Sequence, residues 1–252
     1  MAPVQAEGTS SSRARPVIRW HGLVRLAVSL VAGLVLLGLA IPQTIAAWNA
    51  RDAATVLDKL NAGKPASESE LATGAAALKR ALSWATSARW SADLGFIEVW
   101  QALRLRQQEP QRPQLLADAE RHLTAGLTAN PADGSSWVQL AFVRQLRGAP
   151  DRTIATALMQ SLDVAPYLRA LWIYRAEMLL HYRRVLEPDE ADSFRRQIRT
   201  IWSTGAPFTT ALAEAALRTG EWGAVEEALS VDPAALAEFE KVKASLIPAL
   251  RR

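Results

Sequence analysis

The chain has 252 residues, of which half are apolar and 21% are charged, with a formal net charge of +4 and no cysteine. A composition this apolar can bury a sizeable core, so it excludes a fully disordered protein. The lack of cysteine excludes disulfide scaffolds, thiolate metal sites and cysteine nucleophiles.

The positive charge is concentrated at the start of the chain. Residues 1–25 contain four arginines and one glutamate, so the remaining residues carry 25 basic and 24 acidic groups. A nucleic-acid-binding protein needs a dense basic face to neutralise phosphates. The nearly neutral body therefore predicts no nucleic-acid partner.

Residues 1–22 are rich in Ser, Pro, Ala and Arg and show no periodicity. This composition is typical of a disordered segment that cannot bury enough apolar surface to fold. We predict a disordered, basic cytoplasmic tail over this range.

A membrane-spanning helix is predicted over residues 23–48. The run from Leu26 to Ile41 contains no charged residue, and a spanning helix needs about 20 mainly apolar residues. The predicted helix is long enough if Arg25 extends its side chain to the lipid headgroups. Trp20 and Trp48 lie about 42 Å apart along a helix, which is close to the separation of the two membrane interfaces. We expect Trp20, Arg25 and Trp48 to contact inner-membrane lipid at these interfaces.

The alternative to this anchor is a cleaved secretory signal peptide, which also has a basic start and an apolar core. Its cleavage site needs small residues at two positions, and the segments 40–42 and 44–46 match this pattern poorly. The basic flank favours the cytoplasm in either case. We therefore expect a single-pass protein of a bacterial inner membrane, with residues 49–252 in the periplasm.

The body is predicted to be all-α, because apolar residues recur at helical spacing and no strand alternation is sustained. Asn130-Pro131, Ala165-Pro166 and Ala206-Pro207 separate the predicted helices. The last unit is predicted as helices over 208–219 and 221–229, joined by a turn at Gly220, with a final helix over 234–246.

A faint internal repeat suggests stacked helix hairpins. Pro131 and Pro166 lie 35 residues apart, and Trp137 and Trp172 have the same separation. This spacing resembles the tetratricopeptide repeat (TPR), a helix–turn–helix unit of about 34 residues. The Tyr and Gly usual in its first helix are absent, so a helical bundle remains an alternative for residues 49–252. The residues expected to pack between repeats are Trp100, Trp137, Leu140, Ala141, Pro166, Trp172 and Ala176.

No motif for catalysis, for a metal or for a cofactor is present. His122 and His181 lie far apart and His21 lies in the basic flank, so they do not form a ligand motif. Two groups of carboxylates are explained by helix ends and pairing at i, i+4, namely residues 187–192 and 226–227. We therefore predict no catalytic residue, no metal ligand and no cofactor.

The sequence contains one candidate basic patch. Its members could bind an acidic sugar or a lipid headgroup, although charge on the exposed face of a helix explains them equally well. They are Arg183, Arg184, Arg195, Arg196 and Arg199.

Three segments resemble the VpsP-type polysaccharide biosynthesis proteins, which are single-pass, TPR-like proteins encoded in bacterial exopolysaccharide clusters. These segments are NPADGSSWVQLA at 130–141, ALMQSLDVAPY at 157–167 and FRRQIRTIW at 194–202. The resemblance covers about residues 50–235 and rests on packing residues. It implies a membrane-anchored, non-catalytic scaffold that acts with proteins of a polysaccharide assembly or export machinery.

Two other classes of function remain open at this point. One is a periplasmic TPR-like assembly or folding factor for an unrelated envelope complex. The other is a glycan-processing enzyme, which would need two carboxylates about 5–10 Å apart across a cleft.

Overall fold

The computed structural model describes the backbone of residues 20–246 and the side chains of residues 24–246, which form helices and no strand. The predicted all-α class is confirmed. The helices are α1 (Trp20–Asn61), α2 (Glu68–Trp84), α3 (Ala88–Arg104), α4 (Gln111–Ala129), α5 (Gly134–Leu146), α6 (Asp151–Val164), α7 (Arg169–His181), the 3₁₀ helix η1 (Arg183–Val185), α8 (Pro188–Ser203), α9 (Phe208–Thr219), α10 (Trp222–Leu229) and α11 (Pro233–Leu246).

The chain divides into two compact units, residues 1–44 and 45–252, and each is described here by itself. The described residues of the first unit are the apolar part of α1, which begins at Trp20. Residues 1–19 of the predicted tail lie outside the described residues. Helix α1 is long and apolar enough to cross a membrane. Large apolar side chains between residues 24 and 41 are exposed, including Leu26 and Leu39 at 67% each.

Helix α1 ends at Asn61 rather than at the predicted boundary after residue 48. In the second unit, its last turns place Ala53, Val56 and Leu60 in a core cluster with apolar side chains of α2 and α3. The helix therefore extends beyond the predicted membrane segment because its later residues have an apolar face with partners.

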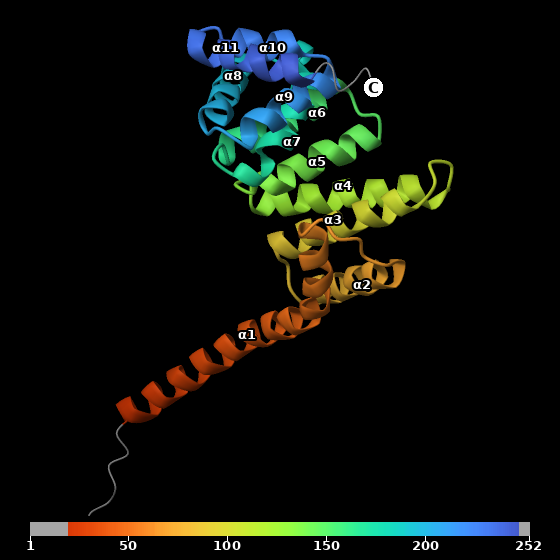
Figure 1. Cartoon of the computed structure of the whole chain (residues 1–252). Coiled ribbons are helices and arrows are strands. Elements are labelled where there is room, and N and C mark those ends of the chain that lie inside the picture. Colours follow the sequence, from red (N-terminus) through yellow and green to blue (C-terminus); the bar gives the residue numbers. More distant parts are fainter. Residues whose placement is uncertain (1–19, 247–252) are drawn as a thin grey trace, which may run out of the picture. The chain divides into compact units, whose positions relative to one another are not determined.

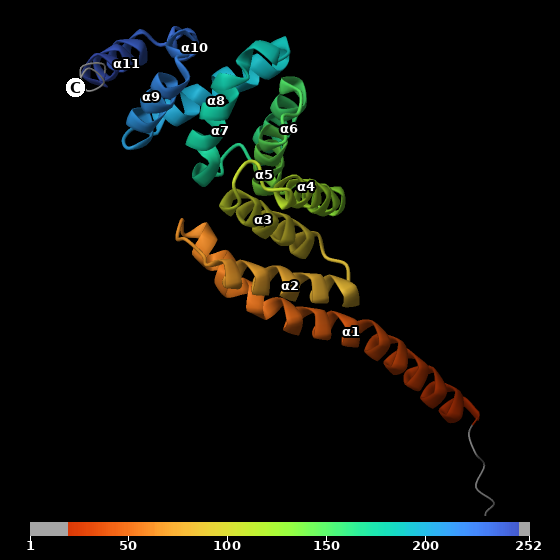
Figure 2. The same cartoon turned by 90° about the vertical axis from the view of Figure 1, so that its right-hand side faces the viewer.

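Helices that are neighbours along the chain also contact each other in space, from α2 to α11 (Figures 1 and 2). The first helices of successive pairs, α3, α5, α7 and α9, contact one another in that order as well. They form one layer of the second unit. Contact between neighbouring helix pairs is typical of helical-repeat proteins, and the TPR-like stacking of these pairs stays a prediction.

Helices α3 and α4 approach each other very closely. A Cβ atom on Gly95 would lie 2.8 Å from Leu123 Cγ and 2.9 Å from the carbonyl oxygen of Ala119. A Cβ atom on Gly126 would lie 2.8 Å from the carbonyl oxygen of Ala88. Both distances are too short for any side chain, so these two glycines allow the helices to pack backbone against backbone.

The predicted 35-residue spacing corresponds to a repeated structural motif. Trp137 Nε1 donates a hydrogen bond of 2.9 Å to the carbonyl oxygen of Pro131, six residues earlier. Trp172 Nε1 donates in the same way to Pro166, at 2.7 Å. Each indole therefore stabilises the turn that precedes its own helix through this hydrogen bond.

The end of the second unit also agrees with the predicted elements. Gly220 ends α9 in the left-handed conformation, with φ at 73°, which glycine adopts without steric cost. Phe239 of α11 is fully buried between Trp202 and Trp222, with ring centroids at 5.5 and 5.7 Å.

Candidate functional site

An open groove follows the layer formed by α3, α5 and α7. Its apolar part, called the aromatic cavity below, has a volume of about 260 Å³. The lining residues are Phe96, Val99, Trp100, Leu103, Val138, Gln139, Phe142 and Tyr174. Because residues 96, 99, 100 and 103 follow helical spacing, α3 presents one continuous apolar stripe to this cavity.

Aromatic rings form two walls of the aromatic cavity. Phe96 and Trp100 meet edge to face with centroids 6.3 Å apart, and Phe142 and Tyr174 do the same at 6.3 Å. Tyr174 remains 40% exposed. Burial of its hydroxyl raises the pKa of Tyr174 well above the usual value, with a smaller effect from Glu177. The cavity is therefore neutral at physiological pH and suited to an apolar side chain.

A polar cavity of about 340 Å³ lies beside the aromatic cavity and shares Phe96 and Gln139 with it. It lies nearer the start of α3, and its polar lining comes from α1, α3, α5 and the turn before α5. The polar residues that line it are Asn61, Arg89, Asp93, Asn130, Asp133, Ser135, Ser136 and Gln139. The two cavities together form a groove with one apolar part and one polar part.

Asp93 is the unusual charge of the polar cavity. Burial raises the pKa of Asp93 to about 6, the nearby Arg89 guanidinium lowers it, and Asp133 adds to the increase. The Arg89 Nε atom lies 3.6 Å from Asp93 Oδ2, and the Arg89 side chain is 87% exposed. Arg89 is therefore a weak counter-ion for a carboxylate that is only 26% exposed.

Asp133 lies in the same cavity but both of its oxygens are occupied by the start of α5. Its Oδ1 accepts hydrogen bonds from the backbone amides of Ser135 and Ser136, at 3.0 and 3.2 Å. Its Oδ2 accepts from the Ser136 hydroxyl at 2.6 Å. A retaining or inverting glycosidase needs its second carboxylate free to act as nucleophile or base. Asp93 and Asp133 thus share a cavity without forming that arrangement.

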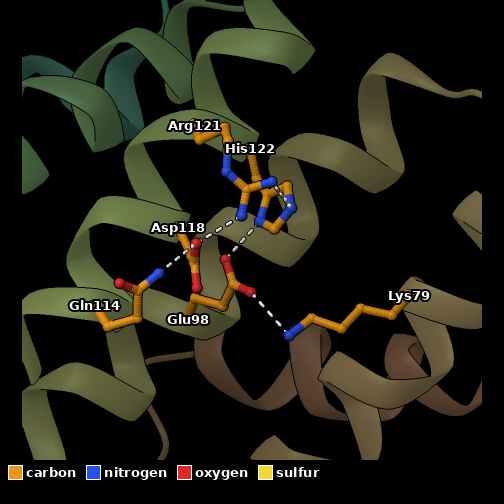
Figure 3. Close-up of polar contacts among 6 residues, drawn as sticks. All are labelled: Lys79, Glu98, Gln114, Asp118, Arg121 and His122. Atoms are coloured by element: carbon orange, nitrogen blue, oxygen red, sulfur yellow. Dashed lines mark hydrogen bonds and ion pairs between the residues drawn. The ribbon is translucent and has the colours of Figure 1, made fainter. Parts of the chain in front are cut away.

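A second group of charges lies inside the helices rather than in the groove. Glu98 of α3 is fully buried, and its Oε2 lies 2.6 Å from His122 Nδ1 of α4. Its Oε1 lies 3.2 Å from Lys79 Nζ of α2. Figure 3 shows the Glu98 carboxylate between these two side chains.

This buried group continues to the surface of α4. The guanidinium of Arg121 lies between His122 Nε2, at 3.3 Å, and Asp118 Oδ1, at 2.6 Å. The hydrogen bond from Arg121 lowers the pKa of Asp118. Because Glu98 has no exposed surface, a substrate cannot reach it in this structure. Its contacts instead join α2, α3 and α4, as a buried and paired carboxylate can.

The residues expected to pack between repeats lie in the core or at its edge. Leu140, Ala141, Trp172 and Ala176 are buried, whereas Trp100, Trp137 and Pro166 are half-buried. Trp172 is covered by Phe208 of α9, with ring centroids 5.3 Å apart. Trp100 also forms part of the wall of the aromatic cavity.

Two of the three expected membrane-interface residues have described side chains. Arg25 is exposed, and Trp48 is 68% exposed with the Arg51 guanidinium 4.4 Å from the centre of its ring. The side chain of Trp20 lies outside the described residues.

The five arginines of the candidate basic patch do not form one free cationic surface. Arg183 Nε donates to Glu221 at 2.5 Å, and Arg195 pairs with Glu227 at 2.9 Å and also with Asp192. Arg196 donates to the Ser193 hydroxyl at 2.8 Å, and Arg199 donates to the carbonyl oxygen of Ala228 at 3.2 Å. Arg184 is exposed. Four of the five side chains therefore have partners within α8 or join η1 and α8 to the α9–α10 turn and to α10.

Arg175 is a structural residue that the sequence analysis missed. It is fully buried, and its Nη1 donates to the carbonyl oxygen of Ser161 at 2.8 Å. It also donates to the carbonyl oxygens of Ala165 and Pro166, at 3.2 and 3.5 Å from Nη2. Burial lowers the pKa of Arg175 to about 10. Its guanidinium thus adds donors to carbonyl groups at the end of α6 and in the turn that follows, which also accept from backbone N–H groups or from Trp172.

The polar cavity and the Glu98 group were also missed. Only the Glu98 group has a signal in the sequence. Glu98 interrupts the apolar run Phe96-Ile97-Glu98-Val99-Trp100, and a lone acid on an apolar face suggests a buried partner. Its partners are 19 and 24 residues away and belong to other helices. No spacing rule connects them.

Among known proteins, no family model matches this chain, and no curated protein is significantly similar to it.

Proposed function

We propose that this chain is a membrane-anchored, non-catalytic adaptor that binds a partner protein in the groove along α3, α5 and α7. The observation that carries the proposal is the aromatic cavity, in which Phe96, Trp100, Phe142 and Tyr174 surround about 260 Å³ of space. Open pockets lined by aromatic rings are typical anchor sites for side chains of a partner.

The anchor is α1, which crosses the bacterial inner membrane once. Its support is the exposed apolar surface of residues 24–41, because a soluble protein rarely exposes a continuous apolar surface of this kind. The arginine-rich flank supports an N-terminus in the cytoplasm and a second unit in the periplasm. This topology holds the groove beside machinery in the same membrane.

The partner belongs to a machinery that assembles or exports an extracellular polysaccharide. The support for this step is the sequence resemblance of segments 130–141, 157–167 and 194–202 to the VpsP-type proteins. The role needs no cofactor and no nucleic acid, and the stacked helix pairs supply an extended binding surface.

A complementation experiment tests this proposal in cells that lack the gene. We expect the full chain to restore secreted polysaccharide and a chain without residues 49–252 to fail. The variant Leu103→Asp places a charge in the aromatic cavity at a side chain that is 37% exposed, and it should reduce the output strongly. The matched control is Val231→Asp, at a side chain that is 70% exposed and lies outside the groove, and it should retain the output.

Other outcomes separate the competing functions. Normal polysaccharide together with a defect in an unrelated envelope complex would favour the alternative of a general assembly factor. Loss of output from Asp93→Asn by about 100-fold or more, with the fold intact, is the size expected for a lost general acid. That result would contradict the non-catalytic role.

A further inference from the structure

The groove has two chemically different parts that lie side by side. The aromatic cavity is apolar, and the adjoining polar cavity contains the Asp93 carboxylate. Phe96 of α3 and Gln139 of α5 line both cavities, so the two cavities adjoin and two neighbouring groups of one ligand can reach them. A ligand that fits the whole groove therefore needs an apolar group next to a polar or charged one.

The charge of the polar cavity favours a cation. Asp93 and Asp133 line it together with Arg89, and Arg89 extends into solvent with 87% of its side chain exposed. Asp133 is already occupied by three hydrogen bonds from Ser135 and Ser136. Asp93 is thus the carboxylate that lacks a close partner, since its shortest distance to Arg89 is 3.6 Å.

Neutral hydrogen-bonding groups also line the polar cavity. The side chains of Asn61, Asn130 and Gln139 line the same cavity, and their amide oxygens can accept hydrogen bonds from a donor-rich cation. A lysine ammonium or an arginine guanidinium has three or five such donors. An acidic ligand would instead place its charge against Asp93, which costs free energy.

We propose that the groove recognises a segment of the partner protein in which a lysine or arginine lies next to a large apolar residue. The apolar side chain occupies the aromatic cavity, and the cationic group occupies the polar cavity and pairs with Asp93. This inference rests on the proposed function and adds to it the chemical identity of the bound segment.

The pairing with Asp93 makes recognition depend on pH. Asp93 has a pKa of about 6, so it is mostly ionised at about pH 8 and mostly protonated at about pH 5. The charged groups near it are Arg89 on its own helix and Asp133 before α5, and the bound cation would add a third. Preference for the basic segment should therefore decrease as the pH falls through about 6.

The test uses the full chain in zwitterionic detergent micelles and fluorescent peptides of about eight residues. Each peptide contains one tryptophan as the apolar anchor, and the neighbouring residue is Lys, Gln or Glu. Binding is measured by fluorescence anisotropy at about pH 8 and at about pH 5. We expect the Lys peptide to bind about tenfold more tightly than the Glu peptide at the higher pH, which corresponds to about 1.4 kcal/mol.

Two variants assign the preference to one carboxylate. Asp93→Asn should remove the difference between the Lys and Glu peptides and should leave binding of the Gln peptide nearly unchanged. Asp58→Asn is the matched control, because Asp58 is exposed and does not line the polar cavity, and it should retain the difference. Far-UV circular dichroism of each variant confirms that the helices are intact.

Each possible result decides between the two proposals. Equal binding of the three peptides, or a preference that persists in Asp93→Asn, would overturn this inference and leave the adaptor role standing. Failure of all three peptides, with Leu103→Asp also without effect in cells, would contradict the groove as a docking surface. Displacement of the Lys peptide by a neutral oligosaccharide would assign the polar cavity to a glycan and overturn recognition of a basic side chain.

Discussion

The helix pair α5/α6 and the pair α7/α8 share a local motif and differ in what covers it. In both, a tryptophan donates to the proline carbonyl six residues earlier, at 2.9 Å for Trp137 and 2.7 Å for Trp172. Trp137 is half-buried, whereas Trp172 is 3% exposed because Phe208 packs against it. The repeat therefore determines the hydrogen bond, and the next helix pair determines the burial.

A second difference appears at the position 35 residues apart in these pairs. Leu140 of α5 corresponds to Arg175 of α7, and both side chains are buried. Leu140 contributes to an apolar cluster with α3 and α4, whereas Arg175 binds the carbonyl groups of Ser161 and Ala165. The same repeat position can thus hold a hydrocarbon side chain or an ion, depending on the backbone groups around it.

The largest expected effect comes from removing the covered tryptophan. Trp172→Ala should lower the free energy of unfolding by about 3–5 kcal/mol, because a large buried side chain is lost. Trp137→Ala should cost about half as much, because less of its surface is buried. Urea unfolding of the purified chain in detergent micelles, followed by circular dichroism, measures both values. Equal losses would show that the two rings are equally buried in solution.

The next largest effect is expected when Arg175 is replaced by leucine, the residue type at the equivalent position of α5. Arg175→Leu should lower the free energy of unfolding by about 2–4 kcal/mol, because several charge-assisted hydrogen bonds from the guanidinium to buried carbonyl groups are lost. Arg175→Lys should recover part of this loss, since an ammonium can still donate to some of them. The same urea titration measures the difference. A neutral effect of Arg175→Leu would mean that the backbone and indole donors of these carbonyl groups are sufficient without the guanidinium.

A smaller effect is expected from removing a partner of Glu98, the buried carboxylate of α3. His122→Ala should cost about 2–3 kcal/mol, because Glu98 would remain buried with only Lys79 as a partner. The double variant with Glu98→Gln should be less destabilised than the sum of the two single variants. Thermal melts of the three variants measure this coupling. Additive losses would show that Glu98 and His122 do not interact.

The smallest effect concerns the pH dependence of stability through Asp93. The folded protein holds the Asp93 proton up to a pH of about 6, while an unfolded chain releases it near pH 4. The contribution of Asp93 to stability is therefore lost as the pH rises from about 4 to about 6. Asp93→Asn should be more stable than the unmodified chain by about 1–2 kcal/mol at about pH 7 and nearly equal to it at about pH 4. A difference that is constant with pH would contradict the raised pKa.

The fold was largely predictable because it depends on patterns within single helices. Helix α9 has the predicted bounds 208–219, and Gly220, at the predicted turn, takes the left-handed conformation. The 35-residue spacing of Trp137 and Trp172 corresponds to the same hydrogen bond in two helix pairs. Such features follow from periodicity and turn chemistry, which are local properties of the chain.

The candidate site was less predictable because it depends on contacts between helices. Asp93 is an ordinary charged residue in the sequence, and residues from other helices and from the turn before α5 complete its cavity, where burial raises its pKa. Glu98 and His122 are 24 residues apart and belong to different helices. The pairing of the candidate basic patch was not predictable for the same reason. Arg183 and Arg195 have acidic partners more than 30 residues away.

The nearest-neighbour packing of α2 to α11 has a consequence for how the protein is made. Each helix packs against helices one or two places away in the chain, so the contacts that stabilise it can form soon after it is synthesised. Chains with such low contact order fold fast and expose apolar surface only briefly. Helix pairs can therefore form one after another from α2 towards α11, each adding to a template that the previous pair has completed.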